Sequence, residues 1–165
     1  MPADREAPQD GVVLVLRALH LGDLLVAVPA LRALRRAWPG RRLVLATRPD
    51  LAPVAELTGA VDAVLPCGGP DELRWPGPPP DLAVNLHGAG PQSHRALDRT
   101  RPRRRLGFRA PGWDGPTWEA VADRHPHERE RWCALLEAHG VPADPDDLRL
   151  RPPPATPDPG NARHG

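Results

Sequence analysis

The chain has 165 residues, with 22 basic and 21 acidic side chains and a formal net charge of +1. This length allows one domain with a real hydrophobic core and is short for two complete α/β lobes. The balanced charge gives no sign of strong attraction to nucleic acid, and we expect at most a peripheral contact with a membrane.

The N-terminus, MPADREAPQD, carries acidic residues and no apolar stretch. We therefore expect residues 1–10 to form a flexible N-terminus rather than a secretory signal. Cys67 and Cys133 lack the paired spacing of a zinc or redox site and are too few for a disulfide framework. These features predict a cytoplasmic location, with the inner face of the membrane as an open alternative.

Strand-like and helix-like segments alternate through the first half of the chain. Val12–Leu16 is a continuous apolar run, typical of a strand buried on both faces. Leu24–Trp38 has apolar residues three and four apart, which predicts an amphipathic helix, and Pro29 should kink or restart it. The next predicted elements are a strand at Leu43–Thr47, a helix at Pro49–Leu57 and a strand at Ala60–Leu65.

The second half continues the alternation less regularly. Its first part, residues 66–80, is rich in Pro and Gly and predicts a loop. The elements predicted after it are a strand at Asp81–Leu86, a helix at Pro91–Leu97, a strand at Arg104–Phe108, a loop at Arg109–Pro126 and a helix at His127–His139. We expect residues 11–141 to form one Rossmann-like lobe and residues 142–165 a Pro-rich linker or tail.

Alternating strands and helices predict an α/β fold, a Rossmann-like parallel sheet flanked by helices. In such sheets ligands bind beyond the carboxyl ends of the strands. Two predicted loops lie at that edge, Arg17–Asp23 after the first strand and His87–Pro91 after the strand that ends at Leu86. We therefore expect a ligand site between these two loops.

Asp23 is a carboxylate placed directly after Gly22, where the first loop enters the helix. One interpretation is an N-cap, which alone would contribute about 1 kcal/mol. The other is a general base at the mouth of the sheet, able to accept a proton from a bound hydroxyl. The residues leave both interpretations open, and one side chain can serve both.

The turn Leu21-Gly22-Asp23 is followed by the segment PALRAL at 29–34 and later by DLAVNLHGAGPQS at 81–93. This ordered set of motifs resembles the N-terminal lobe of glycosyltransferase family 9, the family of ADP-heptose lipopolysaccharide heptosyltransferases. The match continues more weakly through RRRLGF at 103–108 and the end of the last predicted helix. Ala18, Leu19 and His20 depart from the small or polar residues that many members carry before the turn.

The resemblance implies the acceptor-binding half of a GT-B enzyme. Asp23 would match the catalytic base, which deprotonates the acceptor hydroxyl as a heptose-like sugar leaves its nucleotide diphosphate with inversion. The residues that would line the acceptor site, for a saccharide or glycolipid, are Arg17, His20, Gly22, His87, Gly88, Gly90 and Gln92. The scheme requires no metal and no cofactor, and its donor substrate is a nucleotide-diphosphate sugar. The family's donor lobe has no counterpart in these residues, so we expect the chain to be inactive alone unless a separate donor-lobe polypeptide completes it.

Other interpretations stay open. The chain can be a truncated, non-catalytic binding module, or a small nucleotide-binding Rossmann domain. The turn around Gly88 and Gly90 lacks the third small residue of the dinucleotide fingerprint, and a tight turn explains its glycines equally well. The arginines between 95 and 109 can bind phosphates or form a solvated basic face, and His125, His127, His139 and Glu128 match no standard metal spacing.

Overall fold

Five parallel strands form the centre of the molecule, in the computed structural model that describes residues 11–151. Residues 1–10, predicted as a flexible N-terminus, and 152–165, part of the predicted tail, lie outside the described residues. The strands are β1 (Val12–Leu16), β2 (Arg42–Thr47), β3 (Ala63–Pro66), β4 (Leu82–Asn85) and β5 (Arg104–Leu106). The helices are α1 (Leu21–Ala37), α2 (Ala52–Leu57), α3 (Gln92–Asp98), α4 (Trp118–Arg124) and α5 (Glu128–Ala138), with short 3-10 turns at Pro49–Leu51 and Pro70–Glu72.

The strand order is β3-β2-β1-β4-β5, and every pair is parallel. The chain builds outward from β1 to β3 in one direction and then crosses back to β4, which pairs with the other side of β1. This arrangement confirms the predicted α/β class with a Rossmann-like sheet flanked by helices. It also places the reversal of strand order between β1 and β4, the position where ligands bind in open parallel sheets.

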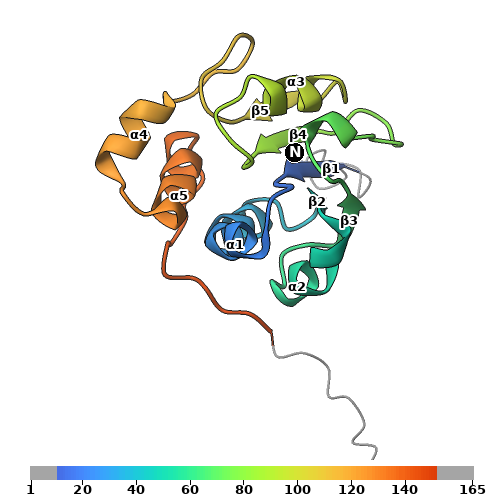
Figure 1. Cartoon of the computed structure of the whole chain (residues 1–165), viewed down its shortest axis with the longest axis horizontal. Helices are drawn as coiled ribbons and strands as arrows, with labels where there is room; N and C mark the ends of the chain where they lie inside the picture. Colours follow the sequence, from blue (N-terminus) through green and yellow to red (C-terminus); the bar gives the residue numbers. More distant parts are fainter. Residues whose placement is uncertain (1–10, 152–165) are drawn as a thin grey trace, which may run out of the picture.

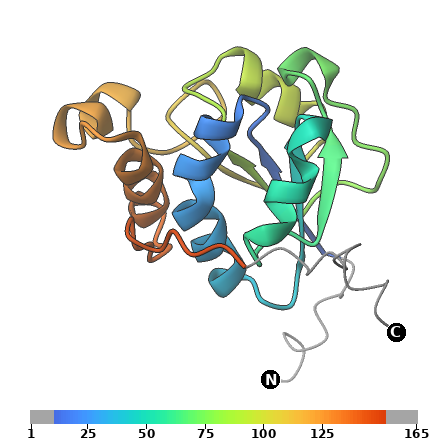
Figure 2. The same ribbon diagram turned by 60° about the horizontal axis from the view of Figure 1, so that its bottom comes forward.

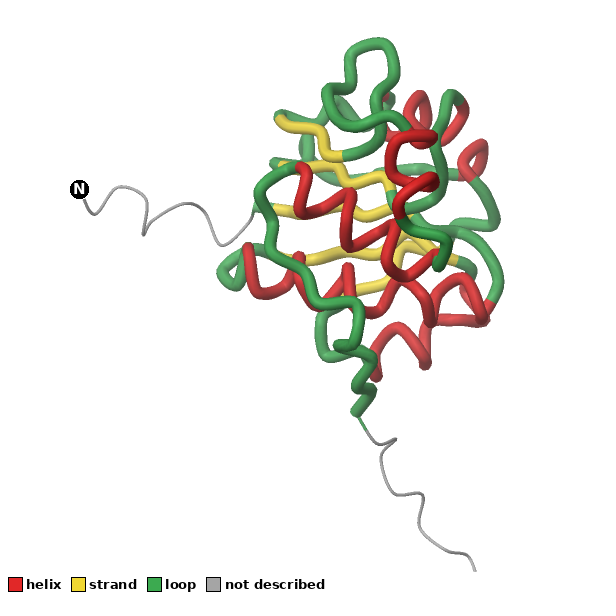
Figure 3. The backbone as a smooth tube through the Cα atoms, turned by 90° about the vertical axis from the view of Figure 1, so that its left-hand side faces the viewer, coloured by secondary structure: helices red, strands yellow, loops and turns green. Residues whose placement is uncertain are grey.

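Helices cover both faces of the sheet (Figure 1). On one face α1 lies between α2 and α5, as Figure 2 and Figure 3 show from two further sides. The core on this face includes Val13, Val15, Leu31 and Trp132, and each of these four is at most 1% exposed. On the other face α3 and the loop after β3 cover Leu14, Leu16 and Ala83. The alternation of side chains along β1 thus supplies both cores.

Three local predictions need correction. Helix α1 begins at Leu21 rather than Leu24, so Asp23 lies in its first turn and His20, not Asp23, is the N-cap. The helix continues through the buried Pro29 and does not restart there. Helix α4, within the stretch predicted as a loop, is real: Thr117 caps it by accepting from the Ala120 N–H at 3.2 Å, and Trp118 packs on Phe108.

The segment after α5 lies across α1. Asp147 accepts hydrogen bonds from Arg32 Nε at 2.8 Å and from an Arg36 terminal nitrogen at 2.7 Å, both on the C-terminal half of α1. Further on, the Arg151 N–H donates to the Leu57 carbonyl at the end of α2. No helix within residues 11–151 has the length and apolar content needed to cross a bilayer.

Candidate functional site

The two loops predicted to form a ligand site lie next to each other, because β1 and β4 are neighbours in the sheet. Leu16 pairs with Asn85, and the Leu86 N–H donates to the Leu16 carbonyl at 3.1 Å. One step further, the Ala18 N–H donates to His87 Nδ1 at 3.2 Å. The structure therefore brings the Asp23 loop and the His87 loop together at the carboxyl edge of the sheet.

Asp23 projects from the first turn of α1 and is 34% exposed. Its Oδ2 accepts the His20 N–H at 3.0 Å, which is the carboxylate half of a capping box. Its Oδ1 lies 4.0 Å from the nearest guanidinium nitrogen of Arg17. The side chain thus stabilises the helix start while its second oxygen keeps a looser contact, so the capping role and the role of a base are compatible in this geometry.

Arg17 is the central buried cation of this edge, with a side chain only 1% exposed. Its Nε donates to the Asp23 carbonyl at 2.5 Å, and a terminal nitrogen donates to the Leu86 carbonyl. The guanidinium also lies 4.9 Å from the ring centre of Trp132. Arg17 was predicted to contact substrate, but in this structure its donors face protein groups and connect the two loops.

His87 is half-buried beside this cation. Because its Nδ1 accepts the Ala18 N–H, the ring is neutral with its proton on Nε2. Burial lowers the pKa of His87 below its ordinary value, and the positive charge of Arg17 lowers it further, while Asp23 opposes the shift. The neutral ring can donate from Nε2 to an oxygen of a ligand.

A buried polar network holds the turn that carries His87. Asn85 Oδ1 accepts the His87 N–H at 2.9 Å and the Gly88 N–H at 3.4 Å. Its amide nitrogen donates to Ser93 Oγ at 2.8 Å and lies 3.1 Å from His94 Nδ1. His94 Nε2 lies 2.9 Å from the Phe108 carbonyl and donates to it, which leaves Nδ1 free to accept from Asn85. Burial also lowers the pKa of His94, so this ring too is neutral.

Sequence reasoning did not single out Asn85, although a buried amide within an apolar strand is a readable signal. It also did not connect Glu128 with this edge. Glu128 Oε1 accepts a hydrogen bond from Arg17 at 2.9 Å across 111 residues of sequence, and no sequence pattern marks such a pair.

The glycines and exposed residues of the predicted site differ in what they do. Gly90 has a φ of 80°, and a Cβ there would overlap the His94 ring, so this turn needs glycine. Gly22 and Gly88 have open space where a Cβ would lie, so packing does not require glycine at either position. His20 and Gln92 are exposed at the starts of α1 and α3.

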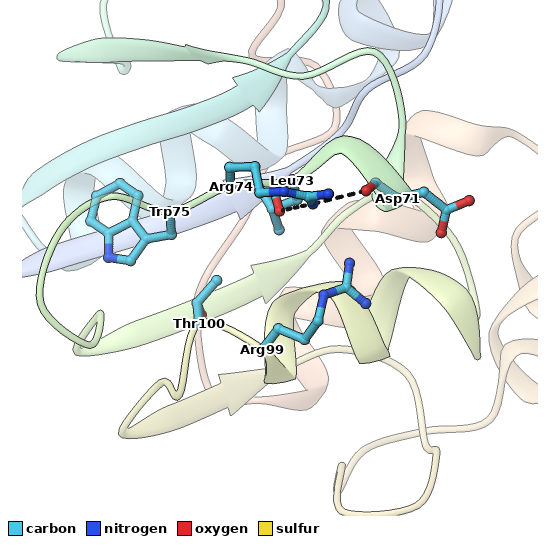
Figure 4. Close-up of a pocket in the computed structure, with 6 residues that line it drawn as sticks. All are labelled: Asp71, Leu73, Arg74, Trp75, Arg99 and Thr100. Atoms are coloured by element: carbon cyan, nitrogen blue, oxygen red, sulfur yellow. Dashed lines mark hydrogen bonds between the residues drawn. The ribbon is translucent and has the colours of Figure 1, made fainter.

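Two cavities that Trp75 lines lie away from this edge. One, of about 470 Å³, is lined by Asp71, Leu73, Arg74, Trp75, Arg99 and Thr100 between the loop after β3 and the end of α3 (Figure 4). The other, of about 440 Å³, runs along β1, β2 and β3 under the Trp75–Pro78 stretch. Neither is lined by Asp23 or His87. Within residues 11–151, no three His, Cys, Asp or Glu side chains gather as a metal site would require.

The parallel sheet with helices on both faces defines a Rossmann-like α/β fold. Solved structures similar to it include glycosyltransferases. A glycosyltransferase family 9 protein from Veillonella parvula matches with a TM-score of 0.66 and 20% identity, covering 85% of this chain and 44% of that one. Heptosyltransferase WaaC of E. coli, solved with ADP, matches with a TM-score of 0.58 and 17% identity over 81% of this chain and 49% of that one. ADP-heptose lps heptosyltransferase II of E. coli matches with a TM-score of 0.57 and 19% identity, covering 90% of this chain and 47% of that one.

These similarities agree with the resemblance carried by the Leu21-Gly22-Asp23 turn and the segment around His87. At identities of 20% or less they show a common fold. The chain spans about half the length of each of these structures. No protein-family model and no curated protein matches the sequence.

Proposed function

We propose that this chain is the acceptor-side lobe of an inverting glycosyltransferase similar to the heptosyltransferases, with Asp23 as its general base. One observation carries the proposal: Asp23 is a partly exposed carboxylate, fixed at the start of α1 beside the His87 loop, at the strand-order reversal of a fold shared with glycosyltransferases. The substrates are a saccharide or glycolipid hydroxyl and a nucleotide-diphosphate sugar, with a heptose-like sugar as the group transferred.

In this scheme the acceptor oxygen attacks the anomeric carbon from the face opposite the leaving nucleotide diphosphate. The bond from the anomeric carbon to the diphosphate oxygen breaks with its electron pair, and the acceptor proton passes to the Asp23 carboxylate. Because the transition state has oxocarbenium character, proton transfer is only partial and a modestly basic carboxylate is sufficient. The neutral His87 ring donates from Nε2 to an oxygen of the acceptor and helps to orient it.

The reaction also needs a binding site for the nucleotide-sugar donor. A glycosyl transfer gains its rate by holding donor and acceptor in one geometry. The described residues supply one sheet edge, and the chain spans about half the length of the solved glycosyltransferases. We therefore propose that a donor lobe outside the described residues completes the cleft, and that residues 11–151 alone do not transfer sugar.

The test is sugar transfer by the chain combined with a donor-lobe polypeptide, comparing the natural sequence with Asp23→Asn. The variant keeps an oxygen that accepts the His20 N–H but loses the base, so we expect turnover to fall about 100-fold or more. Asp81→Asn is the matched control, because Asp81 lies before β4 at the opposite edge of the sheet. Near-natural turnover with Asp23→Asn would reduce Asp23 to a helix-capping residue.

The Rossmann-like sheet also favours a second candidate, a small nucleotide-binding domain, because such sheets bind nucleotides at the carboxyl ends of their strands. Titration of the purified chain with ADP separates these two candidates. An acceptor lobe leaves the nucleotide unbound, whereas tight binding of ADP by the chain alone would identify a nucleotide-binding Rossmann domain and contradict the proposed function.

A further inference from the structure

Helix α5 contributes a side chain to the carboxyl edge. Its first residue, Glu128, is 38% exposed and accepts a hydrogen bond from Arg17 at 2.9 Å. One turn later Trp132 packs its ring against the same guanidinium, and the Trp132 indole N–H lies 3.4 Å from Glu128 Oε1. Two residues of α5 therefore hold the cation that connects the Asp23 and His87 loops.

Arg17 needs a counter-charge because it is a cation almost fully removed from water. Burial lowers the pKa of Arg17, while the hydrogen bond and charge of Glu128 and the charge of Asp23 act in the opposite direction. The two carboxylates are unequally placed: Glu128 is hydrogen-bonded at 2.9 Å, and Asp23 Oδ1 lies 4.0 Å away. Glu128 is thus the close partner of Arg17, and Asp23 is only a distant one.

This division has a chemical consequence. A carboxylate that forms the close ion pair with a buried arginine is held as the anion and accepts a proton poorly. Because Glu128 occupies the position close to Arg17, the ion-pair interaction between Asp23 and Arg17 is the weaker of the two. Glu128 also supports the hydrogen bonds through which Arg17 fixes the Asp23 and Leu86 carbonyls.

We propose that Glu128 is a positioning residue of the site, which neutralises Arg17 so that this cation keeps the Asp23 and His87 loops joined. This inference rests on the proposed function for its catalytic consequence, but its electrostatic part concerns the chain alone. The groups that face Arg17 are Asp23 on α1, Glu128 and Trp132 on α5, and the Leu86 carbonyl and His87 after β4.

The first experiment measures the pKa of His87 by NMR titration of the isolated chain, in the natural sequence and in Glu128→Gln. Glutamine keeps an oxygen for Arg17 and removes the charge. Because the cation is then less neutralised, we expect the pKa of His87 to fall by roughly 0.3 to 0.6 pH unit. A loosened site would instead expose His87 and raise its pKa toward the ordinary value, so a rise or no change overturns the proposal.

Two further variants control this experiment. Glu130→Gln removes a charge from the same first turn of α5, but Glu130 faces His125 at 4.0 Å rather than Arg17, and we expect no change at His87. Glu128→Asp keeps the charge and should leave the pKa of His87 closer to that of the natural chain than Glu128→Gln does. A fall of equal size in Glu130→Gln would overturn the proposal.

The second experiment uses the chain combined with its donor-lobe polypeptide. We expect Glu128→Gln to lower kcat about tenfold, because Arg17 without its charged partner fixes the Asp23 and Leu86 carbonyls less firmly and the reacting groups are less well oriented. The KM for the donor should not change. An unaltered kcat overturns the catalytic part of the proposal. Absence of transfer with the natural chain would instead contradict the proposed function, while the His87 measurement would still decide the role of Glu128.

Discussion

The two edges of the sheet both carry carboxylates, but they use them differently. At the amino edge, Asp62 accepts the Leu43 N–H at 2.8 Å and forms an ion pair with Arg35 at 2.5 Å. Asp81, just before β4, pairs with Arg41 and lies 3.8 Å from Arg103. Each of these carboxylates has a close arginine partner, which is the usual arrangement for a structural acid.

At the carboxyl edge the close arginine partner belongs to Glu128, and Asp23 has one backbone hydrogen bond and a cation at 4.0 Å. Exposure does not explain the difference, since Asp62 is 46% exposed and Asp23 is 34% exposed. The partners do. Asp23 thus lacks the close cation that pairs with each carboxylate of the amino edge, and this difference is the one on which the proposed function depends.

The largest effect should come from the network beneath the carboxyl edge. Asn85→Ala removes the partner of the His87 N–H, Ser93 and His94 in a fully buried position. Leaving such groups unpaired should lower the free energy of unfolding by about 3 kcal/mol, measured by urea denaturation. If the free energy of unfolding fell by less than about 1 kcal/mol, the carboxyl edge would not depend on the Asn85 network. The proposed difference between the two edges would then be wrong.

A smaller effect is expected near the amino edge, where Asp147 holds the C-terminal segment against α1. Burial raises the pKa of Asp147, but hydrogen bonds and charges from Arg32 and Arg36 outweigh it, and the net pKa lies below the ordinary 3.8. A lowered folded-state pKa adds stability that is present above pH 3.8 and is lost as the pH falls through the lowered value.

We therefore expect Asp147→Asn to lower the free energy of unfolding by about 1 kcal/mol at pH 7 and to have little effect at strongly acidic pH. Urea denaturation at several pH values checks this. A difference that grows as the pH falls would show that the ion pairs of Asp147 do not stabilise the fold.

The smallest effect concerns Thr47, at the carboxyl end of β2. Its hydroxyl is buried, and no hydrogen-bond partner lies among the described residues, in contrast to the fully paired Asn85. Thr47→Val removes an unpaired polar atom and nearly keeps the shape, so the free energy of unfolding should rise by about 0.5 kcal/mol. A loss of stability, measured by thermal unfolding, would reveal a partner for this hydroxyl and narrow the contrast with Asn85.

Much of the fold follows from the sequence because its signals are local. The five segments predicted as strands match five observed strands, and the two loops after β1 and β4 were found from the rule that ligands bind at carboxyl ends. Helix α4 was missed because it is short and depends on packing between Trp118, Phe108 and Trp132. The Thr117 cap was its one local sign.

The site divides in the same way. Asp23 was found because it follows Gly22 where the loop after β1 enters a helix, and His87 because it directly follows a strand. The burial of Arg17 and its pairing with Glu128 were not found, because they depend on where α5 packs against α1. Sequence reasoning therefore located the candidate carboxylate, Asp23, but not the ion pair between Arg17 and Glu128 beside it.

Arg17 collects its partners from segments far apart along the chain, at Leu86 and at Glu128. Contacts of this kind form late because closing a long loop costs entropy. During synthesis all five strands leave the ribosome before α5 does. Arg17 therefore gains its hydrogen bond to Glu128 only when α5 docks. A nascent chain stopped before residue 128 would contain all five described strands and would lack this hydrogen bond.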